Sequence, residues 1–174
     1  RLRGAERKLL KEICRILRTE KAKNNTAKIF KKKAVLFLKV RDIMTNPAIS
    51  VTGEDTVCEA ARVMQAHNIG ALPVVSEKNT VDGIVTDRDI VLRTVSRGKD
   101  ACEMKVKDIM TTEVEKITPD TDIKDAVKRL GTDKIRRVPV IEKNELVGML
   151  SIGDIATQSG FNTEIAEAIC EISK

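Results

Sequence analysis

The chain has 174 residues, and its 41% hydrophobic and 33% charged residues fit one compact globular domain or two very small ones. Aromatic residues make up only 2%, which argues against a protein that binds single-stranded nucleic acid by stacking bases on aromatic side chains. The net charge of +6 comes from residues 1–41, which hold 15 of the 32 Lys and Arg but only 3 of the 26 Asp and Glu, so the remainder carries −6.

Residues 1–39 form a basic N-terminal extension. Apolar residues at helical spacing predict an amphipathic helix over 5–20, and a Lys- and Asn-rich linker follows over 21–33. Residues 34–38 are a short apolar run that fits either a strand or a docking segment. We expect this extension to be solvated. Binding of nucleic acid or of a membrane through its positive charges is the alternative interpretation.

The cysteines and the single histidine do not predict a metal site. The four cysteines are widely spaced, and His67 has no partner at the spacing of metal ligands. Structural zinc needs about four such ligands, so we expect reduced thiols, no metal and a surface position for His67. No apolar run approaches the roughly 20 residues that span a bilayer, and no secretory signal is recognisable. We therefore expect a cytoplasmic protein without a membrane span.

Three sequence landmarks occur twice in the same order, which indicates an internal duplication. The first landmark is Arg-Asp-Ile-Met-Thr at 41–45, which returns as Lys-Asp-Ile-Met-Thr at 107–111. The second is Leu-Pro-Val-Val at 72–75, which returns as Val-Pro-Val-Ile at 138–141. The third is Gly-Ile-Val-Thr-Asp-Arg-Asp at 83–89, which returns as Gly-Met-Leu-Ser-Ile-Gly-Asp at 148–154. We define repeat 1 as residues 40–98 and repeat 2 as residues 105–160.

Each repeat predicts a short helical turn followed by strand, helix, strand, strand and helix. The first helix has one apolar stripe, formed by Val57, Ala60, Ala61 and Met64 in repeat 1 and by Ile123, Ala126, Val127 and Leu130 in repeat 2. The paired strands fall at 71–75 and 81–86 in repeat 1 and at 137–141 and 146–151 in repeat 2, and the second helices begin near 87 and 152.

The predicted fold is therefore an α/β (α+β) fold of two β-α-β-β-α repeats related by a pseudo-twofold axis. A C-terminal helix is predicted within 161–174. A repeat of this size is marginal as an independent core, so we expect residues 40–160 to form one inseparable unit.

A proline interrupts the first strand of each pair. Pro73 and Pro139 cannot donate to a strand ladder, so we expect irregular backbone at the same place in both repeats. Free N–H and C=O groups there would suit the edge of an adenine base.

A hydroxyl and a carboxylate are spaced alike in the two repeats. Thr86 and Ser151 close a strand, and Asp89 and Asp154 follow three residues later in the first turn of a helix. Such a carboxylate can accept two hydrogen bonds from a ribose diol, and a helix start favours phosphate. An ordinary helix cap needs the same residues, so the capping interpretation stands beside the binding one.

These stretches resemble a tandem pair of cystathionine-β-synthase (CBS) motifs, called a Bateman module. The resemblance covers residues 40–160 and extends to small stand-alone CBS proteins of bacteria and archaea, including the hypoxic-response type. It implies a regulatory module that binds AMP, ADP, ATP or S-adenosylmethionine between the repeats and signals to a regulated protein by changing conformation. It implies no catalytic residue and no permanent cofactor.

The resemblance also assigns roles to residues. Ribose would be held by Asp89 and Asp154, with the hydroxyls of Thr86 and Ser151 nearby. The walls around the base would come from Ile69, Ala71, Leu72 and Pro73, from Ile135, Val138 and Pro139, and from the strands after Thr45 and Thr111.

Phosphate binding is expected to differ between the repeats. Arg136 and Arg137 are the candidates, with Arg88 and Lys134 behind them, whereas repeat 1 has Gly70 and Ala71 at the positions of the two arginines. Charged phosphates are thus expected near repeat 2. Because neighbouring strand residues alternate sides, the alternative is that only one of the two arginines faces a cleft. We also expect a homodimer. The alternative function is a structural or interaction module without nucleotide.

Overall fold

The computed structural model of the protein describes residues 38–157 and 162–173. The predicted helix at 5–20, the linker at 21–33 and residues 34–37 of the apolar run lie outside the described residues. None of the helices in the described part is long and apolar enough to cross a membrane.

Repeat 1 builds one half of the fold from a three-stranded sheet and two helices. The sheet has the order β1-β2-β3, with β1 parallel to β2 and β2 antiparallel to β3. The elements are a 3-10 turn η1 (Val40–Asp42), β1 (Val51–Thr52), α3 (Val57–His67), β2 (Ala71–Val75), β3 (Val81–Thr86), α4 (Asp87–Arg93) and a second 3-10 turn η2 (Val95–Arg97).

Repeat 2 repeats this order, except that its counterpart of β1 is only an isolated parallel bridge between Ile117 and Val140. Its two strands are antiparallel. The elements are η3 (Val106–Asp108), α5 (Ile123–Thr132), β4 (Arg137–Glu142), β5 (Glu145–Ser151) and α6 (Ile152–Ala156), followed by α7 (Asn162–Ile172). The predicted α+β fold is thus confirmed, and the predicted element order holds except for the first strand of repeat 2, which is reduced to this bridge.

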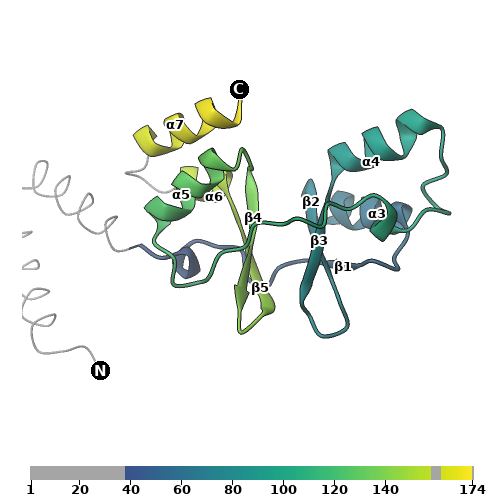
Figure 1. Cartoon of the computed structure of the whole chain (residues 1–174), viewed down its shortest axis with the longest axis horizontal. Helices are drawn as coiled ribbons and strands as arrows, with labels where there is room; N and C mark the ends of the chain where they lie inside the picture. Colours follow the sequence, from purple (N-terminus) through teal and green to yellow (C-terminus); the bar gives the residue numbers. More distant parts are fainter. Residues whose placement is uncertain (1–37, 158–161, 174) are drawn as a thin grey trace, which may run out of the picture.

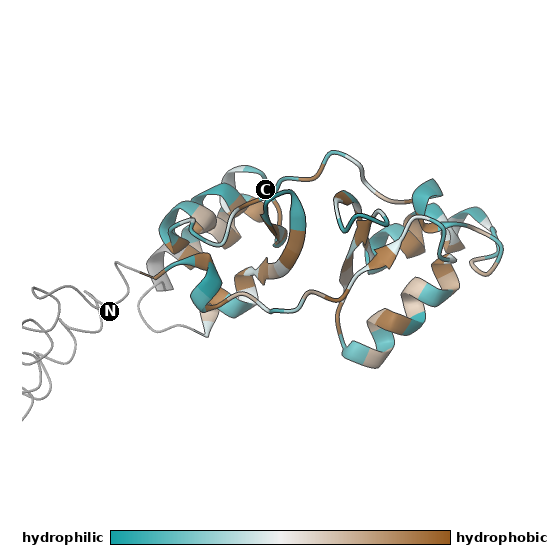
Figure 2. Ribbon diagram, turned by 90° about the horizontal axis from the view of Figure 1, so that it is seen from below, coloured by the Kyte–Doolittle hydropathy of each residue, from teal (hydrophilic) through white to brown (hydrophobic). Residues whose placement is uncertain are grey.

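The strands of the two halves stand beside each other at the centre of the molecule, and the helices lie on the two outer sides (Figure 1). Hydrophobic residues colour the inner strands of both halves, while the outer helices carry both kinds of residue (Figure 2). A small cluster of Val75, Val81 and Leu146 joins the halves near the strand turns. The Asn79 side-chain amide adds to this contact by donating to the Leu146 carbonyl at 3.0 Å.

The opening turn of each repeat packs on the other repeat. Thr45, which follows η1, exchanges backbone hydrogen bonds of 2.9 and 3.0 Å with Met149 in β5. Thr111, which follows η3, exchanges two bonds of 2.9 Å with Ile84 in β3. In Figure 1 the purple segment that holds η1 accordingly lies beside α5 rather than beside its own repeat. The chain therefore crosses between the halves twice.

The exchange extends into the hydrophobic cores. Val40 is fully buried in the core of repeat 2, beside Leu150 and Ile155. Val106 and Ile109 are buried in the core of repeat 1. Each repeat therefore lacks part of its own core, which is the physical basis for expecting one inseparable unit.

Two glycines make the exchange possible. A Cβ on Gly83 would lie 2.7 Å from Met110 Sδ and 2.9 Å from the Thr111 carbonyl oxygen. A Cβ on Gly148 would lie 2.8 Å from Met44 Sδ, so the same contact forms in the other half. The glycine and the methionine are both part of the repeated landmarks, and the structure shows that they meet across the repeats.

The strand irregularity expected at the prolines is present one residue further along. The β2–β3 register shifts between Val74 and Val75, and the β4–β5 register shifts between Val140 and Ile141. The Pro139 carbonyl is occupied, since it accepts a hydrogen bond from the Ile117 N–H at 3.1 Å.

The C-terminal helix α7 packs on α5. Ile165 and Ala168 are buried on this face, and the close approach needs Gly131, where a Cβ would lie 3.1 Å from the Ala168 Cα. The helix predicted within 161–174 is therefore present, and it completes the core of repeat 2.

Candidate functional site: two clefts between the repeats

Two clefts lie between the repeats, and each combines side chains from both. The larger has a volume of about 780 Å³ and the smaller of about 260 Å³. The larger is lined by Ala71, Ile84, Thr86, Asp87, Arg88, Asp89, Thr111, Glu113, Val114, Glu115, Asp133, Ile135, Arg136 and Arg137. The smaller is lined by Thr45, Ala48, Ile49, Asn68, Ile69, Ala71, Arg137, Met149, Leu150, Ser151 and Asp154.

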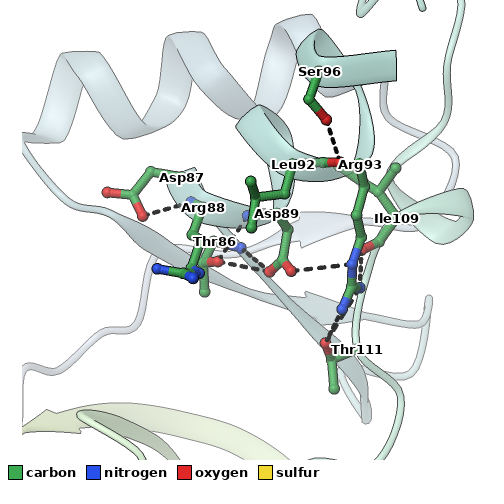
Figure 3. Close-up of polar contacts among 9 residues, drawn as sticks. All are labelled: Thr86, Asp87, Arg88, Asp89, Leu92, Arg93, Ser96, Ile109 and Thr111. Atoms are coloured by element: carbon green, nitrogen blue, oxygen red, sulfur yellow. Dashed lines mark hydrogen bonds and ion pairs between the residues drawn. The ribbon is translucent and has the colours of Figure 1, made fainter. Parts of the chain in front are cut away.

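Thr86 and Asp89 form a reciprocal capping box at the start of α4 (Figure 3). The Thr86 backbone N–H and hydroxyl donate to Asp89 Oδ2 at 2.9 and 2.6 Å, and the Asp89 N–H donates to Thr86 Oγ1 at 3.2 Å. Asp89 Oδ1 pairs with Arg93 Nε at 3.3 Å, and the Asp89 side chain is 15% exposed. The capping interpretation is confirmed, and the capped carboxylate also lines the larger cleft.

Ser151 and Asp154 repeat this arrangement at the start of α6. The Ser151 N–H and hydroxyl donate to Asp154 Oδ2 at 2.8 and 2.7 Å, and the Asp154 N–H donates to Ser151 Oγ at 3.1 Å. Within the described residues, Asp154 Oδ1 has no partner, unlike Asp89 Oδ1. A carboxylate oxygen offers two lone pairs, so Asp154 has more capacity left for a ligand in the smaller cleft.

Arg93 ties the larger cleft to the exchanged opening turn of repeat 2. Its Nη1 donates to the Ile109 carbonyl at 2.5 Å and lies 3.4 Å from Thr111 Oγ1, as Figure 3 shows. The same side chain pairs with Asp89. One guanidinium therefore fixes the candidate ribose carboxylate and the threonine that borders the same cleft. Arg93 was not among the residues predicted from the sequence, although its position four residues after Asp89 on a helix is the spacing of an ion pair.

The residues expected around the base separate into two groups. Thr45, Ile69 and Ala71 line the smaller cleft, and Ala71, Thr111 and Ile135 line the larger. The other four are buried and line neither cleft: Leu72, Pro73, Val138 and Pro139. The cleft walls are therefore made two to four residues before each proline, where the strands begin.

Both candidate arginines face the larger cleft. Arg136 precedes β4, so strand alternation does not separate it from Arg137, the first residue of that strand. Arg88 also lines this cleft, whereas Lys134 is exposed and lines neither. Arg137 is shared, because it also lines the smaller cleft.

The larger cleft also holds carboxylates that were not predicted from the sequence. Asp87, Glu113, Glu115 and Asp133 line it together with Asp89. The signal for two of them was available, since residues 111, 113 and 115 share one side of an extended segment. Among the described residues, the larger cleft thus brings three arginines and five carboxylates together, whereas the smaller cleft has one arginine and one carboxylate, Arg137 and Asp154.

The residues with metal or thiol chemistry lie elsewhere. No group of three His, Cys, Asp or Glu able to hold a metal ion occurs in the described part of the chain. Cys58 and Cys102 are free thiols, and the Cys58 thiol raises the pKa of Cys102 through a hydrogen bond. His67 is exposed at the last position of α3, as expected.

Comparison with known proteins places the chain in a family. The family model of the CBS domain matches residues 40–95 and 106–159. The CBS domain-containing protein YhcV of Bacillus subtilis is 38% identical over 134 residues, which cover 77% of this chain and 94% of that protein. Hypoxic response protein 1 of Mycobacterium tuberculosis is 33% identical over 117 residues, which cover 67% of this chain and 81% of that protein.

Solved structures share the fold. The CBS domain pair of protein MJ0100, solved in complex with 5-methylthioadenosine and S-adenosyl-L-methionine, is 27% identical and has a TM-score of 0.65. The match covers 73% of this chain and 99% of that one. The duplicated landmarks, the paired clefts and these matches lead to one conclusion: the chain belongs to the CBS domain family and carries a tandem pair of CBS repeats.

Proposed function

We propose that the chain is a non-catalytic regulatory module that binds an adenosine compound (AMP, ADP, ATP or S-adenosylmethionine) in the clefts between its CBS repeats. The observation that carries the proposal is the capped hydroxyl–carboxylate pair that borders a cleft in each repeat. The adenosine ligands of the related MJ0100 pair support it. Among the described residues neither cleft is lined by a His or a Cys, which favours binding over catalysis.

The geometry ranks the two carboxylates as ribose ligands. Asp154 Oδ1 is unoccupied within the described residues and can accept both hydroxyls of a ribose diol, whereas Asp89 Oδ1 already pairs with Arg93. Charge-assisted hydrogen bonds of this kind contribute about 1.5–3 kcal/mol each. We therefore expect Asp154 to contribute more to ribose binding than Asp89.

The mechanism follows from the way the clefts are built. A ligand in either cleft contacts both repeats, so it binds best to the arrangement of the repeats that closes around it. Such a ligand shifts the population toward that arrangement and changes the surface that a regulated protein meets.

Calorimetric titration of the chain with AMP, ATP and S-adenosylmethionine tests the proposal. We expect at least one of them to bind and Asp154→Ala to weaken binding at least tenfold, as the loss of one or two charge-assisted bonds predicts. Asp42→Ala is the matched control, because the Asp42 carboxylate likewise accepts the backbone N–H three residues before it, that of Lys39, at 2.8 Å outside both clefts. If no adenosine compound binds the wild-type chain, the module acts through protein contacts alone and the proposal is wrong.

We further propose a cytoplasmic homodimer that docks through α4 and η2. Val91, Leu92 and Val95 are 53%, 48% and 63% exposed there, which makes an apolar face suited to a second copy of the same face. The free thiols of Cys58 and Cys102 fit a reducing compartment. Light scattering should give a dimer mass that Leu92→Glu converts to a monomer mass. A wild-type monomer at high micromolar concentration would contradict the dimer.

A further inference from the structure

Arg137 occupies a special place in the pseudo-symmetric fold. It is the first residue of β4, and its counterpart Ala71 is the first residue of β2. These two residues line both clefts, and no other described residue does. The two matched positions therefore meet between the clefts, and only one of them carries a charge.

The Arg137 guanidinium is held without a partner. The residue is half-buried, and its side chain forms no ion pair or hydrogen bond with any described residue, although its backbone is part of the β4–β5 ladder. Its Nη2 lies 3.7 Å from the place where a Cβ on Gly70 would sit, and Asp87 Oδ2 lies 2.6 Å from the same place. The side chain thus reaches across to repeat 1 through the space that Gly70 leaves open. A half-buried cation without a partner is costly unless an anion joins it.

The two clefts depend on this cation to different degrees. The larger cleft has Arg88 and Arg136 as further cations. In the smaller cleft, Arg137 is the only cation among the described lining residues. A phosphate in the smaller cleft would therefore rely on Arg137, whereas a phosphate in the larger cleft would compete for it.

We propose that Arg137 is a phosphate-binding residue shared by the two clefts and that it makes them antagonistic toward phosphorylated adenosine compounds. The inference rests on the proposed function. A guanidinium binds phosphate through a planar fork and can direct that fork into one cleft at a time. The phosphate that binds first takes Arg137, and the second ligand then binds without it. Linkage makes this effect reciprocal, so it does not depend on which cleft fills first.

The uncharged Ala71 contributes to the same coupling of the two clefts. If repeat 1 also had an arginine at this position, each cleft could have its own cation, and two like charges would meet where the repeats join. The difference between Ala71 and Arg137 thus turns two similar pockets into a coupled pair.

Calorimetric titration of the full chain with AMP tests the proposal, with adenosine as the matched ligand that lacks the phosphate. Asp154→Ala weakens the smaller cleft and Asp89→Ala, to a lesser degree, the larger, so each variant reports mainly the affinity of the other cleft. We expect the second AMP to bind the wild-type chain about 5-fold or more weakly than it binds the same cleft in the variants. A factor of this size lies within the usual range of coupling between sites. Adenosine should bind the two clefts independently.

Arg137→Met removes the cation and keeps an unbranched apolar stem, so the packing around the strand is retained. We expect it to abolish the antagonism and to weaken AMP in the smaller cleft much more than it weakens adenosine. Arg136→Met is the matched control, because Arg136 lines only the larger cleft, and it should preserve the antagonism.

The outcomes separate the two proposals. Independent binding of two AMP molecules to the wild-type chain, or antagonism that survives Arg137→Met, would overturn the sharing of Arg137 while leaving the nucleotide-binding function intact. Failure of both adenosine and AMP to bind would instead overturn the proposed function on which the inference rests. Urea unfolding of each variant without ligand shows whether it is folded.

Discussion

The two repeats are alike in the backbone and the caps that build the clefts, and they differ in the side chains that reach into them. The capping boxes of Asp89 and Asp154 have nearly the same hydrogen-bond lengths. Around them, Arg93 occupies one carboxylate and not the other, and an arginine at 137 faces an alanine at 71. The two copies of the pocket therefore share their backbone and helix caps and differ in the charged side chains around them.

The cores of the two halves show a similar contrast. Ile109 is 1% exposed in the core of repeat 1, whereas its counterpart Ile43 is only partly buried against the core of repeat 2. Both side chains belong to an opening turn that packs on the other repeat. The exchange is thus symmetric in topology and unequal in burial.

The largest expected difference between the halves is the loss of stability when each of these two isoleucines is changed to alanine. Ile109→Ala is expected to lower the free energy of unfolding by about 2–5 kcal/mol, the usual loss for a buried isoleucine. Ile43→Ala should cost clearly less, because its side chain already contacts water. Urea unfolding measures both. Equal losses would contradict the difference in burial, and two separate transitions would contradict the view that the repeats share their cores.

The next largest effect is expected where the repeats are most alike. Gly83→Ala and Gly148→Ala each place a Cβ 2.9 Å from a backbone carbonyl of the exchanged turn, of Thr111 and Thr45 respectively. These carbonyls cannot move freely, because they accept hydrogen bonds from the neighbouring strand. We expect each variant to lose about 1–3 kcal/mol, the usual cost of overpacking.

The control for this prediction is Gly153→Ala, where the new Cβ would make only an ordinary contact of 3.4 Å with Ser151 Oγ. It should be neutral or slightly stabilising in a thermal unfolding experiment, since alanine suits a helix better than glycine. A loss at Gly153 as large as those at Gly83 and Gly148 would show that the effect does not come from the exchanged turns.

The order of elements was predictable from sequence because each depends on local patterns. The apolar stripe of α3, the strand pair around Pro73 and the Thr86–Asp89 cap all fell where the repeats placed them. The C-terminal helix likewise followed from its spacing of apolar residues.

The pairing of these elements in space was not predictable in the same way. The exchange of opening turns brings Thr111 to repeat 1 and Thr45 to repeat 2, and no local pattern records it. The cleft-lining carboxylates Asp87 and Asp133 come from different repeats, so they become neighbours only after the halves assemble. The position of Arg137 between the clefts depends on the same assembly.

The smallest expected effect concerns the first helices, which begin differently in the two repeats. Thr56 caps α3, and Glu59 Oε2 accepts the Thr56 backbone N–H at 2.7 Å and its hydroxyl at 2.8 Å. At the matching position of α5, Asp122 makes no side-chain cap. The hydrogen bonds from Thr56 hold the pKa of Glu59 below its ordinary value of 4.5, the backbone bond contributing most.

A carboxylate whose pKa is lowered by folding stabilises the protein above its unfolded pKa, and it loses that contribution as the pH falls through the folded pKa. Glu59→Gln should therefore be less stable than the wild-type chain at neutral pH, and the difference should vanish in acid below the folded pKa. Urea unfolding across this pH range measures it. Asp125→Asn, the matching change in α5, removes a first-turn carboxylate without a capping bond, so it isolates the contribution of the helix dipole. An equal loss of stability at neutral pH in both variants would mean that the capping bonds of Glu59 add nothing to the stabilisation by the helix dipole. The starts of α3 and α5 would then be equally stabilised by their carboxylates, despite their different caps.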